Sequence, residues 1–259
     1  MTSVPLPPAF LALPVAHRAL HDRAAGVIEN SPTAIRKAIA AGYAIEIDIQ
    51  LSADGEAMVF HDEELDRLTG EKGWVKDRSA AELGQILLKD SSDPILTLTQ
   101  VLKIVAGQVP LLIEIKDQTL TMSETDGRLE AACARALKGY RGDVALMSFN
   151  PHSVAHMARL CPDLPRGLTT SAYDPGEWAP LDPETCDRLR EIPDYAPTFS
   201  SFISHEASDL ARPRVAELKA GGAAILCWTI RSAAGEARAR AVADNVTFES
   251  YPAALPAPG

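Results

Sequence analysis

The chain has 259 residues, of which 46% are hydrophobic, enough to bury one enzyme-sized core. Its formal net charge of −10 at pH 7 argues against a surface built for nucleic acid or anionic membranes, because such surfaces bind through spread lysine and arginine side chains. We expect one soluble domain over residues 1–259, a small-molecule partner, no nucleic acid and no stable membrane anchor. The sequence leaves the oligomeric state open.

We expect no targeting signal in the first residues. The apolar start is interrupted by Pro5, Pro7, Pro8 and Pro14, and no lysine or arginine precedes Arg18. No apolar run reaches the roughly 18 residues of a membrane-spanning helix. The 4 cysteines are far apart, as is typical of reduced thiols. We therefore expect a cytoplasmic protein.

After Pro14, short apolar runs alternate with longer amphipathic stretches. Strands are predicted over residues 15–17, 44–51, 111–116, 144–149, 166–170, 199–204, 224–230 and 246–249. Helices are predicted over residues 32–41, 98–106, 124–137, 151–160, 183–191, 209–220 and 233–243, three of them with proline in the first turn. This alternation predicts an α/β fold, a (β/α)₈ TIM barrel.

Residues 62–94 break the alternation. They carry many charges, Gly70, Gly73 and a short helical piece over residues 80–87. The segment is too long for a plain connection and too short for a domain. Because loops of this fold grow at the C-terminal ends of the strands, we expect a small inserted subdomain after the second strand, on the catalytic side.

Two acids in the second predicted strand are the strongest chemical signal. Glu46 and Asp48 are spaced i, i+2, so in a strand their side chains share one face. The strand over residues 111–116 adds a third acid, Glu114, with Lys116 on the same face. Three hard oxygen ligands from neighbouring strands suit Mg²⁺ or Ca²⁺. An acidic pair alone is equally compatible with ion-paired strand ends.

Histidines follow the first two predicted strands. His17 and Arg18 leave the first strand, where an imidazole can transfer a proton and a guanidinium can bind a phosphate. The Asp54-Gly55 turn brings the chain back, so that His61 returns toward the carboxylates. Two histidines, an arginine, three acids and a lysine would together suit cleavage of a phosphodiester.

The remaining candidates carry weaker signals. His21, His152 and His156 fall on loop or helix patterns and are expected at the surface. His205 follows a predicted strand, which leaves open whether it lines the pocket. Trp228 ends the seventh strand and fits either a core position or a substrate-binding position.

The motifs occur in a familiar order: His17-Arg18, Glu29-Asn30-Ser31, Glu46-Ile47-Asp48, Asp54-Gly55, His61-Asp62, Leu96-Thr97-Leu98, Glu114-Ile115-Lys116 and Ser148-Phe149. This order resembles the glycerophosphodiester phosphodiesterase family. The similarity is dense from Val15 to Lys116 and thinner as far as Trp228-Thr229.

The resemblance implies a metal-dependent barrel that hydrolyses glycerophosphodiesters to glycerol 3-phosphate and an alcohol. It implies His17 and His61 as the acid/base pair and Arg18 and Lys116 as phosphate contacts. The implied metal ligands are Glu46, Asp48 and Glu114. In the implied mechanism the neighbouring glycerol hydroxyl attacks phosphorus and gives a cyclic phosphate that water opens.

The chain departs from the family pattern in three places. Ala19 stands where the family has glycine, Ile28 begins the motif that usually starts with proline, and Phe248-Glu249-Ser250 replaces a Thr-Asp pair near the end. Two alternatives also remain. In the first alternative the enzyme acts on a lysophospholipid or sphingolipid, which an apolar rim formed by Trp74 and residues 86–88 would favour. In the second alternative the barrel is catalytically silent and only binds a ligand.

Overall fold

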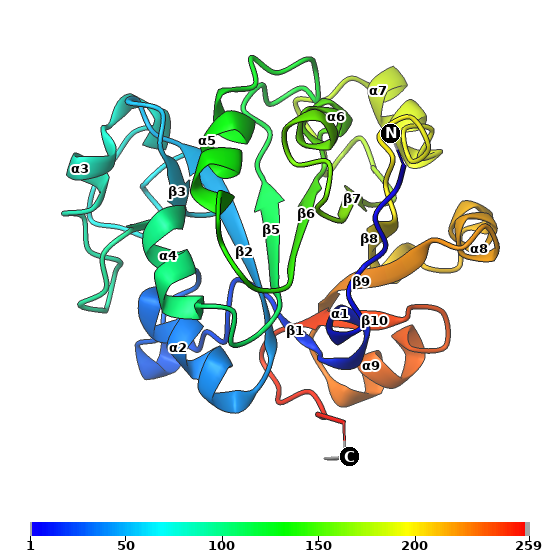
Figure 1. Ribbon diagram of the computed structural model, residues 1–259, viewed down its shortest axis with the longest axis horizontal. Coiled ribbons are helices and arrows are strands. Elements are labelled where there is room, and N and C mark those ends of the chain that lie inside the picture. Colours follow the sequence, from blue (N-terminus) through cyan, green and yellow to red (C-terminus); the bar gives the residue numbers. More distant parts are fainter. Residues whose placement is uncertain (1, 257–259) are drawn as a thin grey trace.

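The computed structural model describes residues 2–256. Within them, eight parallel strands close into a barrel (Figure 1). The barrel strands are β1 (Val15–Ala16), β2 (Ala44–Leu51), β5 (Leu111–Ile115), β6 (Val144–Ser148), β7 (Arg166–Thr170), β8 (Phe202–Glu206), β9 (Ala224–Ile230) and β10 (Asn245–Phe248). The barrel is closed because β1 pairs with both β10 and β2. The predicted (β/α)₈ TIM barrel is therefore confirmed.

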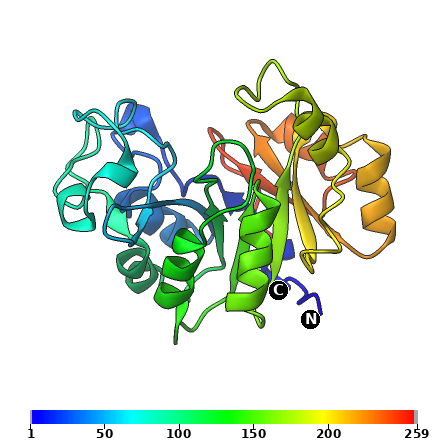
Figure 2. The ribbon, with the colours of Figure 1, turned by 90° about the horizontal axis from the view of Figure 1, so that it is seen from above.

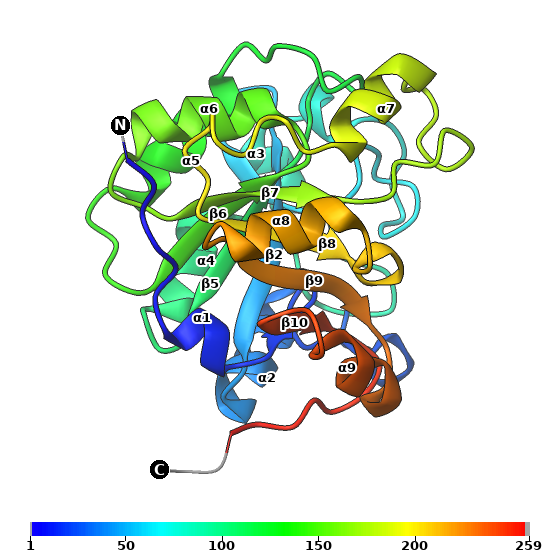
Figure 3. The same ribbon diagram turned by 90° about the vertical axis from the view of Figure 1, so that its right-hand side faces the viewer.

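Most helices follow a strand and lie around the outside. The helices are α1 (Ala9–Ala12), α2 (Pro32–Ala41), α3 (Ala80–Leu83), α4 (Leu98–Val105), α5 (Arg128–Leu137), α6 (Pro151–Leu160), α7 (Pro183–Arg190), α8 (Pro213–Ala220) and α9 (Ala233–Ala239). Helix α1 instead precedes β1, and α3 lies within residues 62–94. Figure 3 shows α8 and α9 on the outer side of β9, which both contact. None of the helices in residues 2–256 is long and apolar enough to cross a membrane.

The predicted boundaries are wrong by several residues in five places, one of them the short helical piece over residues 80–87, which ends at Leu83 as α3. Helix α5 begins at Arg128 because Gly127, just before it, takes a left-handed conformation with φ 75°. Helix α8 begins only at Pro213, after a 3₁₀ turn, and α9 ends early at Ala239. Strand β8 begins at Phe202 because Phe199 lies in a turn with φ 54°.

The short helix α1, which was not predicted, closes the N-terminal end of the barrel. Phe10 is fully buried there among inward-facing apolar side chains, including Val15, Leu112 and Phe202. The side-chain amide of Asn245 donates to the carbonyl oxygens of Phe10 and Leu13, both at 2.7 Å. This apolar plug leaves the C-terminal ends of the strands as the open, polar end.

Strand β2 separates apolar from acidic side chains. Ile45, Ile47 and Ile49 belong to the outer core that packs beneath the helices, whereas Glu46 and Asp48 alternate with them and face inward. The end of β2 also forms the predicted hairpin with β3 (Ala57–Val59), which in turn pairs with β4 (Leu96–Thr97). Gly55 in its turn has φ 83°, a conformation that favours glycine.

The segment after β3 forms a lobe beside the barrel, seen from above in Figure 2. It has its own small apolar cluster, which includes Phe60, Leu65, Leu83 and Leu88. Leu88 is therefore buried, and Lys76 lies over the Trp74 ring at 4.6 Å. Trp74 and Ile86 are partly buried, and Leu87, with 53% exposure, is the exposed side chain of the predicted apolar rim.

Candidate active site

Three carboxylates gather inside the open end of the barrel. Asp48 of β2 is the register partner of Glu114 of β5, and Glu46 lies two residues earlier on β2. One ligand oxygen from each residue lies within 4.8 Å of the others, and all three side chains are buried. Hard oxygen donors at this spacing fit a divalent cation such as Mg²⁺ or Ca²⁺.

The charge balance of these carboxylates supports that fit. Burial, together with the charges of Asp48 and Glu114, raises the pKa of Glu46 well above its usual value. Burial also acts to raise the pKa of Asp48, but Lys116 and other cationic neighbours hold it below its usual value. The Lys116 Nζ atom lies 3.1 Å from Asp48 Oδ1 and 2.7 Å from Glu114 Oε1. Lys116 thus compensates part of the negative charge of the three carboxylates, and a bound divalent cation would compensate more of it.

His17 follows β1 and is held by a carboxylate from the neighbouring strand. Its Nδ1 lies 2.6 Å from Glu249 Oε2, just beyond β10. The hydrogen bond from His17 holds the pKa of Glu249 well below its usual range, so Glu249 is an acceptor and His17 Nδ1 carries the proton. His17 Nε2 is then the nitrogen available to a substrate.

The sequence predicted His21 at the surface, but the structure places it in a partly buried position. The turn after β1 folds the residue back toward Glu249. Its Nε2 lies 3.6 Å from the same Glu249 oxygen, and its side chain is 19% exposed. The other bond of Glu249 goes to Arg231, whose Nε donates to Oε1 at 2.7 Å.

His61 has a similar arrangement built from a different part of the chain. Its Nδ1 lies 2.7 Å from Asp62 Oδ1, and Arg67 donates from Nε to Asp62 Oδ2 at 2.6 Å. Burial acts to raise the pKa of Asp62, but the hydrogen bonds from His61 and Arg67 lower it below its usual value. Asp62 is thus an ionised acceptor, which again leaves Nε2 of the histidine for a substrate.

Arg18 connects the carboxylates to the loop before α2. Its backbone N–H donates to Glu46 Oε2 at 2.7 Å, and its guanidinium Nη1 donates to Glu29 Oε1 at 2.8 Å. Arg67 binds the same Glu29 carboxylate through both of its Nη atoms, at 2.9 and 2.8 Å. The neighbouring Asn30 donates from Nδ2 to Asp48 Oδ2 at 2.9 Å. Glu29 and Asn30 therefore orient residues that face the cavity.

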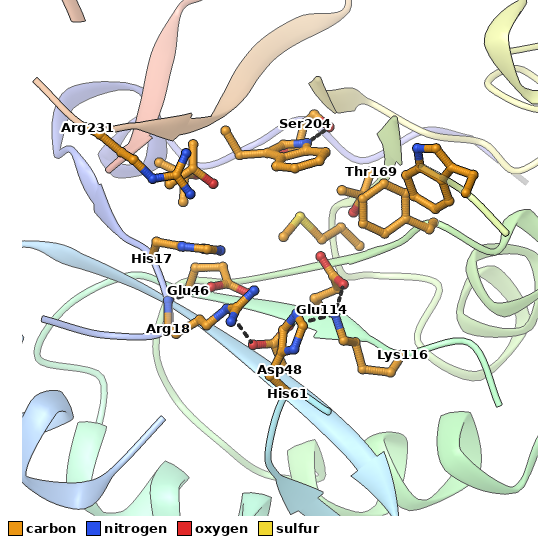
Figure 4. A pocket seen from close by; sticks show the side chains of 16 residues that line it. His17, Arg18, Glu46, Asp48, His61, Glu114, Lys116, Thr169, Ser204 and Arg231 are labelled. Atoms are coloured by element: carbon orange, nitrogen blue, oxygen red, sulfur yellow. Dashed lines mark hydrogen bonds and ion pairs between the residues drawn. The ribbon is translucent and has the colours of Figure 1, made fainter. Parts of the chain in front are cut away.

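These groups surround one cavity of about 290 Å³. In Figure 4, the carboxylates, Arg18 and Lys116 lie toward one side, and Thr169, Ser204 and Arg231 lie toward the other. The Trp228 ring also lines the cavity, with its indole N–H donating to the Ser204 carbonyl at 3.0 Å. Trp228 is thus at the pocket wall, one of the two positions that its sequence context allowed.

Every predicted site residue lines this cavity: His17, Arg18, Glu46, Asp48, His61, Glu114, Lys116 and Trp228. His205 does not line it. This side chain is buried, with Nδ1 2.8 Å from Thr170 Oγ1 and Nε2 3.2 Å from Asp209 Oδ2. The sequence reasoning missed the roles of Glu249, Asp62 and Arg67. Asp62 could have been found from its place beside His61, whereas Arg67 carries no such signal.

Comparisons with known proteins agree with this architecture. The glycerophosphoryl diester phosphodiesterase family model matches residues 17–248, and the chain belongs to this family of phosphoric diester hydrolases. A glycerophosphodiester phosphodiesterase of Caldanaerobacter subterraneus is 31% identical over 166 residues, which cover 60% of this chain and 65% of that relative. A putative glycerophosphodiester phosphodiesterase of Bacillus subtilis is 25% identical over 216 residues, 80% of this chain and 82% of that relative.

Solved structures show the same fold. An Oleispira antarctica phosphodiesterase, determined in complex with the product sn-glycerol-3-phosphate, aligns with a TM-score of 0.72 at 24% identity and covers 93% of this chain and 94% of that one. A putative glycerophosphoryl diester phosphodiesterase of Silicibacter pomeroyi aligns with a TM-score of 0.73 at 22% identity, covering 97% of this chain and 91% of that one.

Proposed function

We propose that the protein hydrolyses glycerophosphodiesters to glycerol 3-phosphate and an alcohol, with a divalent cation held by Glu46, Asp48 and Glu114. The observation that carries the proposal is the presence, in one cavity, of three buried carboxylates and two histidines, each fixed at Nδ1 by a carboxylate. Family membership supports the substrate class. The product bound in the Oleispira antarctica phosphodiesterase, sn-glycerol-3-phosphate, is the one expected here.

The cationic groups of the cavity suit a phosphodiester. A bound divalent cation would supply positive charge against the charge that develops on the phosphate oxygens. Arg18 and Lys116 line the same cavity and supply further hydrogen-bond donors. Arg18 is oriented for this by its bond to Glu29. Both side chains are thus proposed phosphate contacts, and Trp228 is a proposed wall for the bound substrate.

The two histidines are proposed to move protons through Nε2. Burial lowers the pKa of His17, although the hydrogen bond to Glu249 opposes this, so the imidazole is neutral near pH 7. A neutral imidazole with its proton fixed on Nδ1 can accept a proton at Nε2, which suits the base. His61 then takes the acid role and protonates the leaving alcohol.

The proposed nucleophile is the glycerol hydroxyl next to the phosphorylated carbon. A hydroxyl already held beside phosphorus has a large effective concentration compared with free water. Its oxygen bonds to phosphorus as His17 takes its proton, and the alcohol leaves with a proton from His61. Water then opens the cyclic phosphate, and the two histidines exchange roles.

A hydrolysis assay with glycerophosphocholine tests the function and the cation site together. The wild-type chain should release glycerol 3-phosphate with added Mg²⁺ or Ca²⁺ and stop with chelator. Glu46→Gln, Asp48→Asn and Glu114→Gln should each lose most turnover and bind the metal more weakly in calorimetry. Glu124→Gln, which changes an exposed acid outside the cavity, is the control. Full activity of a ligand variant in metal-stripped buffer would contradict the assignment.

The nucleophile is tested with the 2-deoxy analogue of glycerophosphocholine. We expect the analogue to be turned over poorly, because it lacks the attacking hydroxyl, and phosphorus NMR of the normal substrate to show a transient cyclic phosphate. Equal turnover of the two substrates with no cyclic species would show that water attacks phosphorus directly.

A further inference from the structure

A second cavity of about 420 Å³ opens directly beside the reaction cavity. We call it the side cavity; it lies between the start of the inserted lobe, the loop after β5 and the loop after β7, and its lining includes Glu63, Leu120, Met122, Glu177 and Leu181. Glu114, Lys116, Phe149 and Trp178 line both cavities. A phosphodiester held at the carboxylates can therefore extend one of its two substituents into the side cavity.

Aromatic rings form the wall between the two cavities. The centroids of Phe149 and Trp178 are 4.9 Å apart, and the buried ring of Tyr173 supports Trp178 at 4.7 Å. Phe149 also contacts Trp228 edge to face at 5.5 Å. A wall of mutually packed rings is rigid and exposes π faces, which attract cations as well as apolar groups.

Two carboxylates in the side cavity lack a compensating charge. Within residues 2–256, the side chains of Glu63 and Glu177 have no ion pair and no hydrogen bond. The other charges are satisfied: Asp117 accepts hydrogen bonds from Thr119, Met122 N–H and Asn150, and Lys116 is paired with Asp48 and Glu114. The side cavity thus offers uncompensated negative charge next to aromatic faces.

The part of the reaction cavity across from the carboxylates has a different chemistry (Figure 4). The hydroxyls of Thr169, Ser204 and Thr247 line it, are buried and have no hydrogen-bond partner within residues 2–256. Unpartnered buried hydroxyls are costly and suit a ligand that carries hydroxyls of its own, as the glycerol of the substrate does. With glycerol against these hydroxyls, the leaving alcohol can extend past Phe149 and Trp178, which line both cavities, into the side cavity.

We propose that the side cavity receives the leaving alcohol and selects an alcohol that carries an ammonium group. The proposal rests on the proposed hydrolysis of glycerophosphodiesters and narrows its substrate class. The ammonium would lie against Phe149 and Trp178, with Glu63 and Glu177 supplying the opposite charge. A neutral alcohol of the same shape keeps the apolar contact but loses both electrostatic contributions.

The experiment compares two esters that differ only in charge. Glycerophosphocholine is compared with its 3,3-dimethylbutyl analogue, in which carbon replaces the quaternary nitrogen. We expect the wild-type chain with added cation to favour the choline ester by roughly 3- to 30-fold in kcat/KM, mostly through KM. Glu63→Gln combined with Glu177→Gln should lower this ratio severalfold, because only the contribution of the aromatic faces to ammonium binding remains. Glu64→Gln, an exposed neighbour outside the side cavity, is the matched control.

Binding alone gives a second measurement. Tetramethylammonium, but not tert-butanol at equal concentration, should quench tryptophan fluorescence saturably in the wild-type chain and not in Trp178→Leu. Equal turnover of the two esters by the wild-type chain, or an undiminished preference in the double variant, would overturn the proposal while leaving the hydrolase function intact. If neither ester is hydrolysed, the proposed function fails, and the fluorescence titration still decides whether the side cavity binds the cation.

Discussion

The two histidines that we propose as catalytic are held by carboxylates of different origin. Glu249 follows β10, which pairs with β1, so its bond to His17 joins neighbouring strands of the barrel itself. His61 instead contacts Asp62, the next residue, which is fixed by Arg67 from the inserted lobe. The first pair therefore depends on the register of the sheet, and the second depends on a charged network at the edge of the barrel.

This difference predicts that the two histidine–carboxylate pairs respond differently to salt. Register is maintained by backbone hydrogen bonds and by the packed core, which salt affects little. The network of Arg67 is partly exposed, with its side chain 44% accessible, so salt screens its ion pairs. We expect the His17 side to tolerate changes of ionic strength and the His61 side to respond to them.

Loss of either imidazole should have the largest effect. His17→Ala and His61→Ala should each lower kcat on the order of 10²- to 10⁴-fold, the usual contribution of a general acid or base, with little change in thermal unfolding. On a substrate with a strongly acidic leaving alcohol, the His61 variant should recover more activity than the His17 variant. The reverse recovery would exchange the acid and base roles.

The partner carboxylates should have the next largest effects. Glu249→Gln and Asp62→Asn keep the side-chain shape but remove the acceptor charge that fixes the histidine, so each should lower kcat about 10- to 100-fold. The pH profile of kcat/KM provides the diagnostic readout. In Glu249→Gln the acidic limb, which reports deprotonation of the base His17, should appear at lower pH, because the hydrogen bond from His17 to Glu249 raises the pKa of His17. An unchanged profile would show that Glu249 has only a structural role.

The sequence predicted the barrel and its inward acids because these depend on local periodicity. The alternation of Glu46 and Asp48 with isoleucines determines which face of β2 is polar, whatever lies around it. The contacts of Glu249 and Arg67 could not be predicted in this way. Glu249 contacts a residue 232 positions away, and Arg67 contacts Glu29 across 38 positions, so both depend on the complete fold.

The folding stability of the protein at low pH should depend on Glu29, which joins the loop before α2 to Arg67 of the lobe. Burial acts to raise its pKa, but the bonds from Arg67 and Arg18 lower it from 4.5 to about 2. Between these values the unfolded chain binds more protons, so this stabilisation is complete above about pH 4.5 and is lost as the pH falls toward 2. Allowing for the partial exposure of Arg67, we expect about 1–2 kcal/mol.

Urea unfolding of wild-type chain and Glu29→Gln between pH 6 and 3 measures that contribution. The difference in unfolding free energy should shrink as the pH is lowered. A difference that stays constant over this range would show that the charge of Glu29 does not stabilise the fold.

The smallest effect, and the most direct test of the comparison, is expected from Arg67→Met. The substitution keeps an unbranched side chain but removes the bonds to Asp62 and Glu29, so His61 and Arg18 both lose a support while every cavity residue stays in place. Exposed ion pairs contribute little each, and we expect a loss of only about 3- to 10-fold in kcat/KM. Arg78→Met is the matched control, because Arg78 lies in the same lobe and pairs with Glu71 away from the cavity. Salt dependence gives a second measurement. Raising the ionic strength to about 0.5 M should weaken the Arg67 pairs in the wild-type chain, so the ratio of wild-type to Arg67→Met activity should fall toward one. The ratio of wild-type to Glu249→Gln activity should stay constant when the ionic strength is raised in the same way. Parallel salt dependence of both ratios would mean that the two histidines are held equally by the barrel, and the proposed difference between register and charged network would have to be given up.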